Sequence, residues 1–399
     1  MNVVRKIQAF NAGRDPERLQ LKYAKLRRSP SAFLRGTCHL FYERLPSGGD
    51  FKSAPRTWVC GDLHLENFGS YKADNRLIHF DISDFDEAAL APASWELVRM
   101  LTSLQVSADE LGIGAAATRA LGPTFIDAYA AALMLGKALW VERETAHGPV
   151  RTLLDSLHER ARSPFLDSRT QLQSRRRVLR VDGKKALAAT AAQRAEVGAF
   201  MANFARSQPD AAFYELLDVA RRISGTGSLG LDRFVVLVRG TGSPNANYLL
   251  DLKLAQPSCL LTRLKVRQPR WSTEAQRIVA IQQRMQAVSM AFLRPVVMDG
   301  QSYVLRELQP HEDRITLDAG PRAPKEIEQA VVTMGRLLAW AQLRSAGRDG
   351  SAIADDLIDF ACRKKWRSRL LDAAQDCVLQ LQDDAAAYNE AFDDGAFKL

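Results

Sequence analysis

The hydrophobic period of this chain changes at about residue 223, and this change strongly limits the folds open to it. Between about 93 and 220, apolar residues recur at helical spacing, as in "PASWELVRMLTSLQVSADELG". From about 223, short apolar runs such as "RFVVLVRG", "NYLLDLKLA" and "SYVLREL" are separated by Gly, Pro, Asn and Asp, as in antiparallel strands. A helical pattern returns at "KEIEQAVVTMGRLLAWAQLRSAG". The sequence therefore predicts an α+β protein with one sheet between helical segments.

Composition narrows the class of protein without naming a function. The 399 residues are 46% hydrophobic and 25% charged, and no stretch approaches the ~18 apolar residues of a membrane helix. Five cysteines, an odd number without a CxxC pair, indicate neither a disulfide framework nor a zinc knuckle. We expect a cytoplasmic protein that has no membrane partner.

The net charge of +9 favours anionic partners. The densest basic run lies at about 175–185, in "SRTQLQSRRRVLRVDGKKA". It has no interleaved aromatic residues to stack on bases, so a solvated surface or linker explains it better than a nucleic-acid groove.

The stretch "CGDLHLENFG" places ionisable groups where the apolar "TWV" strand ends. Asp62 and Asn67 have the Asp-x-x-x-x-Asn spacing of a kinase catalytic loop, in which Asp accepts a hydroxyl proton and Asn holds a metal. A second strand then ends in Asp81, Asp84 and Asp86, whose oxygens suit Mg²⁺. The alternative is a loop of ordinary turn and capping residues.

A phosphate-covering loop and a lysine are predicted further along the chain. "GTGSLG" fits G-x-G-x-x-G through Gly225, Gly227 and Gly230, with Ser228 among them. A helical pattern, "DAAFYELLDVARRIS", precedes it and a strand follows, which excludes a dinucleotide fingerprint. The next strand carries Lys253, a candidate phosphate ligand. Glu274 is its predicted acidic partner, with Gln282 as an uncharged alternative.

These blocks, together with "FLRGTCHLFY", "FDISDFDEA" followed by "PASWELVR", "YVLRELQP" and "GRLLAWAQLRSAG", resemble the bacterial family catalogued as domain of unknown function 2252. That family is regarded as a remote relative of aminoglycoside and choline phosphotransferase-like kinases, so the resemblance implies a kinase-like fold. Matched by motif, it points at Asp62, Asn67 and Asp84. Three further residues belong to the family blocks: Arg35, His64 and Asp86.

The order of the blocks differs from that of an ordinary kinase, because the catalytic loop precedes the glycine loop. We therefore expect a circularly permuted, two-lobe, protein-kinase-like fold. Residues 1–220 would form a helical catalytic lobe, 221–312 a small nucleotide lobe, and 313–399 helices that complete the catalytic lobe. Glu307, in the hinge strand "YVLRELQP", is assigned to the nucleotide.

Some positions depart from the kinase and family patterns. Cys60 stands where aminoglycoside-type kinases usually have His, Asp232 where protein kinases have Val, and Gln342 where related sequences often have His. None of these changes removes a predicted metal ligand, but they leave turnover open.

The sequence therefore predicts an ATP- and Mg²⁺-dependent phosphotransferase acting on a small hydroxylated acceptor, with an anionic metabolite also fitting the basic charge. Two alternatives stay open. One is a pseudokinase or nucleotide-binding scaffold without turnover. The other is a metal-dependent phosphoesterase, which "GDLH" suggests, although the upstream Asp-x-His and downstream Gly-Asn-His of that class are missing.

Overall fold

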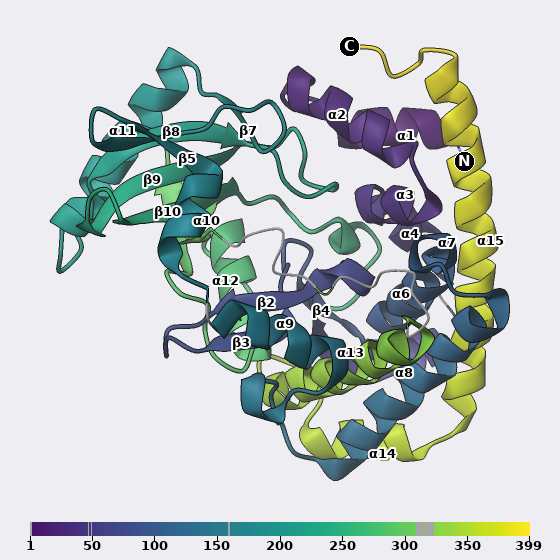
Figure 1. Cartoon of the computed structure of the whole chain (residues 1–399). Coiled ribbons are helices and arrows are strands. Elements are labelled where there is room, and N and C mark those ends of the chain that lie inside the picture. Colours follow the sequence, from purple (N-terminus) through teal and green to yellow (C-terminus); the bar gives the residue numbers. More distant parts are fainter. Residues whose placement is uncertain (1, 47, 49, 159, 309–314, 316–322) are drawn as a thin grey trace.

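Strands and helices separate into two parts of the molecule, with most of the sheet on one side and the long helices on the other (Figure 1). The structure is a computed structural model, and it describes residues 2–46, 48, 50–158, 160–308, 315 and 323–399. The end of the predicted hinge, residues 309–310, and the predicted boundary at 312/313 lie outside the described residues. The mixed α+β class is confirmed.

The largest sheet in the described part of the chain has six antiparallel strands in the order β11-β12-β10-β9-β8-β7. The predicted strands of the region after residue 223 are confirmed. The strands of this sheet are β7 (Ala186–Ala188), β8 (Leu216–Arg222), β9 (Arg233–Gly242), β10 (Ala246–Leu254), β11 (Arg294–Met298) and β12 (Gln301–Glu307).

The prediction of continuous helix between 93 and 220 is wrong near its end. "LLDVARR" forms strand β8, and the strands β5 (Thr170–Gln173), β6 (Arg176–Leu179) and β7 also fall in this region. Apolar residues at 216, 217, 219 and 220 fit either period, and pairing with β9 decides the outcome. The sheet therefore begins before residue 221.

Helices cover both faces of the six-stranded sheet. Helix α11 (Ala191–Arg206) packs on one face, where Val197 and Met201 meet Val236 and Leu250. Helix α10 (Arg162–Arg169) and the β5–β6 hairpin cover part of the other face. Helix α12 (Glu274–Met285) follows β10 and packs against β11, β12 and α13.

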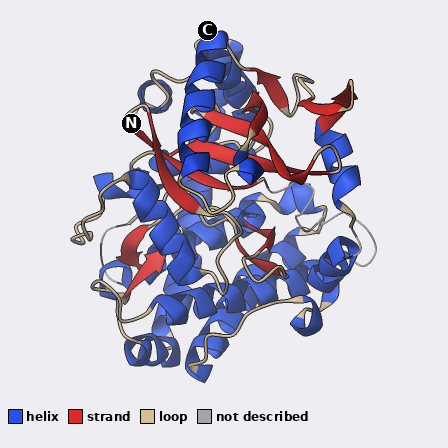
Figure 2. Ribbon diagram, turned by 90° about the vertical axis from the view of Figure 1, so that its left-hand side faces the viewer, coloured by secondary structure: helices blue, strands red, loops and turns tan. Residues whose placement is uncertain are grey.

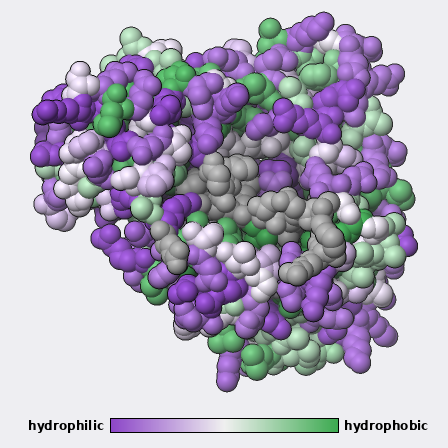
Figure 3. Space-filling model, viewed as in Figure 1, coloured by the Kyte–Doolittle hydropathy of each residue, from purple (hydrophilic) through white to green (hydrophobic). Residues whose placement is uncertain are grey.

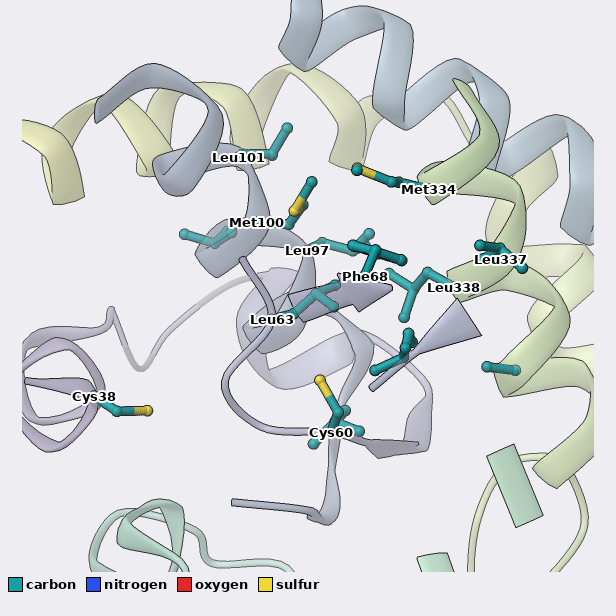
Figure 4. Packing of buried hydrophobic residues seen from close by; sticks show 14 of the residues in the cluster. Cys38, Cys60, Leu63, Phe68, Leu97, Met100, Leu101, Met334, Leu337 and Leu338 are labelled. Atoms are coloured by element: carbon teal, nitrogen blue, oxygen red, sulfur yellow. The ribbon is translucent and has the colours of Figure 1, made fainter. Parts of the chain in front are cut away.

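The helical part is built around α6, α8, α13 and α15. Leucine and methionine side chains from α6 and α13 meet Leu63 and Phe68 in one core beside the loop after β1 (Figure 4). The helices of this part are α3 (Pro30–Gly36), α4 (Cys38–Arg44), α5 (Asp50–Ser53), α6 (Ala93–Val106), α7 (Ala108–Leu111), α8 (Ala115–Leu135), α9 (Gly148–His158), α13 (Ala323–Ser345), α14 (Ala354–Cys362) and α15 (Lys365–Asp393).

Two short antiparallel pairs lie within the helical part. β1 (Arg56–Val59) pairs with β4 (Ala89–Pro92), and β2 (Phe68–Lys72) pairs with β3 (Ile78–Ile82). The turn at 60–67 and the turn at 83–88 therefore leave the ends of paired strands, and this brings the two predicted acidic motifs together.

The two chain ends lie side by side. Helices α1 (Val3–Phe10) and α2 (Pro16–Leu26) lie near the end of α15 (Figure 1), and Gln8 donates to the carbonyl of Ala396 at 2.9 Å. Figure 2, turned by 90°, again shows most strands in the upper part and helices filling the lower part. Hydrophilic residues cover most of the face seen in Figure 3. None of the helices in the described part of the chain combines the length and apolarity needed to cross a bilayer.

Candidate active site

One cleft of about 650 Å³ collects residues from several distant parts of the sequence. Its walls come mainly from the segment after α1, the end of α3, the turns that follow β1 and β3, and the glycine loop between β8 and β9. Most of the predicted site residues lie on this cleft, namely Arg35, Asp62, His64, Asn67, Asp84, Asp86, Gly225, Gly227, Ser228 and Gly230.

Helix α6 holds the backbone of the loop after β1. Gly61 has a φ of +84°, and a Cβ there would lie 2.1 Å from the carbonyl oxygen of Glu87, so glycine is required. The buried carboxylate of Glu96 accepts hydrogen bonds from the amides of Cys60 at 2.7 Å and Gly61 at 3.2 Å. Burial raises the pKa of Glu96 to about 7.

The same helix holds the side chain of Asp62. Nε of the buried Arg99 donates to Oδ1 of Asp62 at 2.8 Å, and Nη2 contacts the same oxygen. Burial alone would lower the pKa of Arg99, but the Asp62 carboxylate outweighs it and raises that pKa. Oδ2 of Asp62 has no hydrogen-bond partner among the described residues, so it could position a hydroxyl or accept its proton.

His64 and Arg35 lie at one wall of the cleft. Arg35 forms an ion pair with Glu66, and Nδ1 of His64 accepts a hydrogen bond from the Glu66 amide at 3.2 Å. A Cβ on Gly227 would lie 3.2 Å from the carbonyl oxygen of Arg35, so the glycine loop passes close to α3. His64 and Arg35 therefore both line the cleft, although the charge of Arg35 is balanced by Glu66.

Asn67 ties the two acidic turns together. Its Nδ2 donates to the carbonyls of Asp62 and Asp84, each at 3.1 Å, and its Oδ1 accepts from the Asp84 amide at 2.8 Å. The side chain is buried. In this conformation the side chain of Asn67 holds the backbone of Asp84 and is not free to bind a metal, which differs from the role predicted for it.

Lys253 faces the aspartates of the second turn. Its Nζ lies 3.7 Å from Oδ2 of Asp84 and forms a closer ion pair with Asp86, although the predicted partner was Glu274. Burial opposes ionisation of Asp84, but Lys253 and then Arg306 outweigh it and lower the pKa of that carboxyl. Strand β10 thus delivers a buried ammonium to the two carboxylates.

A second charged cluster lies on the same face of β10, around Asp251, two residues before Lys253. The carboxylate of Asp251 is fully buried and contacts Arg222 at 2.8 Å, Arg233 at 2.6 Å and Arg306 at 3.3 Å. Burial opposes ionisation of Asp251, but the arginines outweigh it and hold its pKa well below the usual value. Three guanidinium groups therefore share one carboxylate, and two of them, Arg306 and Arg233, also lower the pKa of Asp84.

The glycine loop joins β8 to β9 and has a strained backbone that suits glycine. Gly225 and Gly230 have φ of +76° and +88°. The amides of residues 225–228 donate no hydrogen bond to any described residue. Runs of amides around a left-handed residue form concave sites for anions.

Several predicted residues take other roles. Glu274 forms an ion pair with Arg277 at 2.6 Å, three residues later on α12, and so does not reach Lys253. The alternative, Gln282, is buried and lies 3.2 Å from Oε1 of Gln286. Glu307 lies 3.9 Å from Arg162 and lines two other cavities.

Asp81 also differs from its predicted role as a metal ligand. It is buried away from the cleft lining, and it accepts hydrogen bonds from the amides of Ile82 at 2.8 Å and Ala287 at 3.3 Å. Burial raises the pKa of Asp81 to about 6. Its carboxylate joins β3 to the segment after α12.

The basic run at 175–185 includes strand β6, the second strand of the β5–β6 hairpin, and the turn after it. Ser174 and Arg175 have positive φ at the hairpin turn. Arg177 is buried and donates to the carbonyl of Pro244 and to Asp167, each at 2.6 Å. Part of the run is therefore structural.

Asp84 and Asp86 are the predicted metal ligands that could together hold a hard cation at the cleft. Among the described residues, no group of three or more His, Cys, Asp or Glu side chains is placed to hold a metal ion. Mg²⁺ commonly takes one or two protein carboxylates together with phosphate oxygens and waters. These two carboxylates therefore fit a Mg²⁺ ion that arrives with a nucleotide better than a resident metal.

Sequence reasoning missed four residues around the cleft. Glu96 and Arg99 stand three apart in "PASWELVR", a spacing that puts both on one helix face, and this was a usable signal. Glu87, whose side chain accepts from the Cys259 amide at 2.6 Å, follows directly after Asp86. Arg14 lies in a segment without any motif, and no pattern indicated it.

Fold and site together define an α+β protein in which an antiparallel sheet and a helical part enclose a polar cleft. Residues 14–391 match the family model described as "Uncharacterized protein conserved in bacteria (DUF2252)", and the chain belongs to this family. No curated protein and no solved structure matches the chain.

Proposed function

We propose that this protein is an ATP- and Mg²⁺-dependent phosphotransferase with a kinase-like site. The observation that carries the proposal is the contact of the buried Lys253 with Asp84 and Asp86, two aspartates that line the same cleft as the glycine loop and Asp62. The glycine loop would cover the phosphates and Lys253 would bind them. Asp84 and Asp86 would hold Mg²⁺, which neutralises phosphate charge when it is bound.

The connection of the sheet supports a kinase-like fold. The glycine loop joins β8 to β9, the lysine lies on β10, and helix α12 follows before β11 and β12. Protein kinases have the same succession of glycine loop, lysine strand and helix αC. The acidic partner that αC supplies in kinases is missing, because Glu274 pairs with Arg277.

The chain ends support a circular permutation. Gln8 on α1 and Ala396 after α15 are hydrogen-bonded at 2.9 Å, so the first and last described helices lie together. A fold whose ends adjoin can be reopened at another surface loop with little energetic cost. Helix α13 would then be the one that precedes the catalytic loop, and it contacts β1, the strand that leads into that loop.

Asp62 is the proposed acceptor-side residue. Its Oδ1 is engaged by Arg99, and Oδ2 is available to a substrate hydroxyl. A small hydroxylated acceptor fits the volume of about 650 Å³ alongside a nucleotide's phosphates.

Nucleotide titration with and without Mg²⁺, followed by γ-phosphate transfer and phosphate-release assays, tests this function. We expect Mg²⁺-ATP to bind more tightly than ATP alone, and Asp84→Ala to abolish the difference. Asp74→Ala, which changes an exposed aspartate at the β2–β3 turn, is the control and should keep the Mg²⁺ effect. An unchanged Mg²⁺ dependence in Asp84→Ala would refute the metal assignment.

A nucleotide-binding scaffold without turnover is the second candidate. The observation in its favour is that the side chain of Asn67 is already spent on the backbone of Asp62 and Asp84. ATP binding without transfer or hydrolysis at any metal would favour the scaffold. The phosphoesterase alternative has less support, because two-metal sites need clustered ligands and the described residues contain no such cluster.

A further inference from the structure

The segment between α1 and α2 donates hydrogen bonds to carbonyl oxygens of the glycine loop. Nη1 of Arg14 donates to the carbonyls of Gly227 at 2.7 Å and Leu229 at 3.0 Å. The amide of Asp15 donates to the carbonyl of Gly230 at 2.9 Å. A Cβ on Gly230 would lie 2.8 Å from the Cβ of Arg14, so this segment and the loop are in close contact.

Helix α2 adds two ammonium groups to the same loop. Nζ of Lys22 donates to the carbonyl of Gly227 and to Oδ1 of Asn11, each at 2.8 Å. Nζ of Lys25 lies 3.2 Å from the carbonyl of Gly225. These contacts use only carbonyl oxygens of the loop, and the amides of residues 225–228 donate to no described residue.

Arg14 and Lys22 form no ion pair with a described carboxylate, and Glu87 acts on both charges only from a longer distance. No carboxylate of the described residues lies within ion-pairing distance of either group. Arg14 lines the cleft, and its Nε and Nη2 make no hydrogen bond to the described residues, so two donor nitrogens stay free. Burial lowers the pKa of Arg14 to about 10, so the group stays charged at neutral pH.

Lys22 differs from Arg14 because it is completely buried. Burial, and then the charge of Arg14, lowers its pKa well below the usual value. A buried ammonium with only neutral acceptors is costly, and a nearby anion reduces that cost. The arrangement therefore favours a ligand that brings negative charge to the loop.

We propose that Arg14 and the amides of residues 225–228 form a polyphosphate-binding site, and that Lys22 is a positioning residue that keeps the glycine loop in its binding conformation. The nucleotide as natural ligand rests on the proposed function, whereas the anion site rests only on the contacts described here. Arg14, which precedes every motif of the kinase-like pattern in the sequence, would then contribute directly to phosphate binding.

Calorimetric titration with tripolyphosphate, and separately with ATP, tests the role of Arg14. Arg14→Ala should weaken tripolyphosphate binding by about 10- to 100-fold, the range expected for hydrogen bonds to charged groups. Arg5→Ala is the matched control, because Arg5 is exposed on α1 and lies outside the cleft lining. At equal ionic strength the control should stay within about twofold of the wild type.

Equal binding by Arg14→Ala and Arg5→Ala would overturn the proposal, and so would a wild type that binds neither probe. If Arg14 controls tripolyphosphate binding but no transfer occurs, the anion site stands and the phosphotransferase function fails. If transfer occurs and Arg14→Ala leaves both affinities unchanged, the reverse holds.

Hydrogen exchange of the loop tests the positioning role of Lys22. In Lys22→Met, the hydrogen-bonded loop amides of Leu229 and Leu231 should exchange at least about tenfold faster, while amides in α15 keep their rates. If this variant does not fold, Lys25→Ala provides the same readout, because Lys25 is only partly buried. Unchanged loop exchange in the folded variant would overturn the positioning role.

Discussion

Arg99 and Asp62 form an ion pair in which the guanidinium is fully buried and the carboxylate is 23% exposed. The guanidinium also donates to the carbonyl of Leu34 at 3.1 Å. Arg99 therefore holds Oδ1 of Asp62, a residue that lines the cleft. Oδ2 of the same carboxylate has no hydrogen-bond partner among the described residues.

This pairing predicts a difference between two substitutions of Asp62. Asp62→Ala leaves a buried guanidinium without its counter-charge, and we expect a loss of about 3–5 kcal/mol in the free energy of unfolding. Asp62→Asn should cost less, because an amide oxygen still accepts from Arg99. Urea unfolding followed by circular dichroism measures both. Asp372→Ala, at an exposed position on α15, should stay within about 0.5 kcal/mol of the wild type.

Asp62→Asn is also the sharper test of catalysis, because it preserves the contact with Arg99. If Oδ2 positions or deprotonates an acceptor hydroxyl, transfer should slow by ~10²–10⁴-fold. Nucleotide affinity should stay nearly constant, since this side chain faces the acceptor. Measuring ATP affinity and single-turnover transfer on the same preparation separates the two effects. A parallel loss of nucleotide affinity would place Asp62 at the phosphates instead.

Lys253→Met should give the opposite pattern. It removes the ammonium that contacts Asp84 and Asp86, and with it the proposed phosphate contact. Nucleotide affinity and transfer rate should both fall. The free energies of nucleotide binding and of transition-state stabilisation should each become less favourable by ~1.5–3 kcal/mol. Lys137→Met, in the exposed segment after α8, is the control. Unchanged ATP affinity in Lys253→Met would remove the lysine from the site.

The strands after residue 223 and the long helices could be predicted because their apolar residues follow one period over many positions. Strand β8 could not, because its apolar residues fit both periods and only the pairing with β9 selects the extended form. The neighbouring strand β7 is three residues long, too short for any periodic signal. Local sequence does not encode such pairings.

Motif spacing singles out Asp62 and Asp84, which line one cleft, and Lys253, whose Nζ lies 3.7 Å from Oδ2 of Asp84. Motif spacing does not reveal hydrogen bonds. It therefore predicts Asn67 as a metal ligand, whereas the side-chain amide of Asn67 links the two turns. The predicted partner of Glu274 is Lys253 on strand β10, but Glu274 instead forms an ion pair with Arg277 on its own helix, α12. Arg14 reaches the cleft only through the packing of α1 and α2 against the glycine loop.

The last prediction concerns pH and the carboxyl of Glu96. Burial raises its pKa from 4.5 to about 7, so between these values the folded protein binds a proton that the unfolded chain releases. Stability should therefore fall as pH rises through this window, by at most on the order of 3 kcal/mol. Glu96→Gln keeps an oxygen acceptor for the amides of Cys60 and Gly61 but cannot ionise.

Urea unfolding of wild type and Glu96→Gln at pH 5 and pH 8 measures this linkage. The variant should gain stability relative to the wild type as the pH rises, because only the wild type must bury a charge. Asp372→Ala should show no such trend, since its carboxylate was exposed. A difference between wild type and Glu96→Gln that is the same at both pH values would mean that Glu96 is ionised in the folded protein across this range. The two amides would then hold a carboxylate, and the loop that carries Asp62 would not depend on pH through this residue.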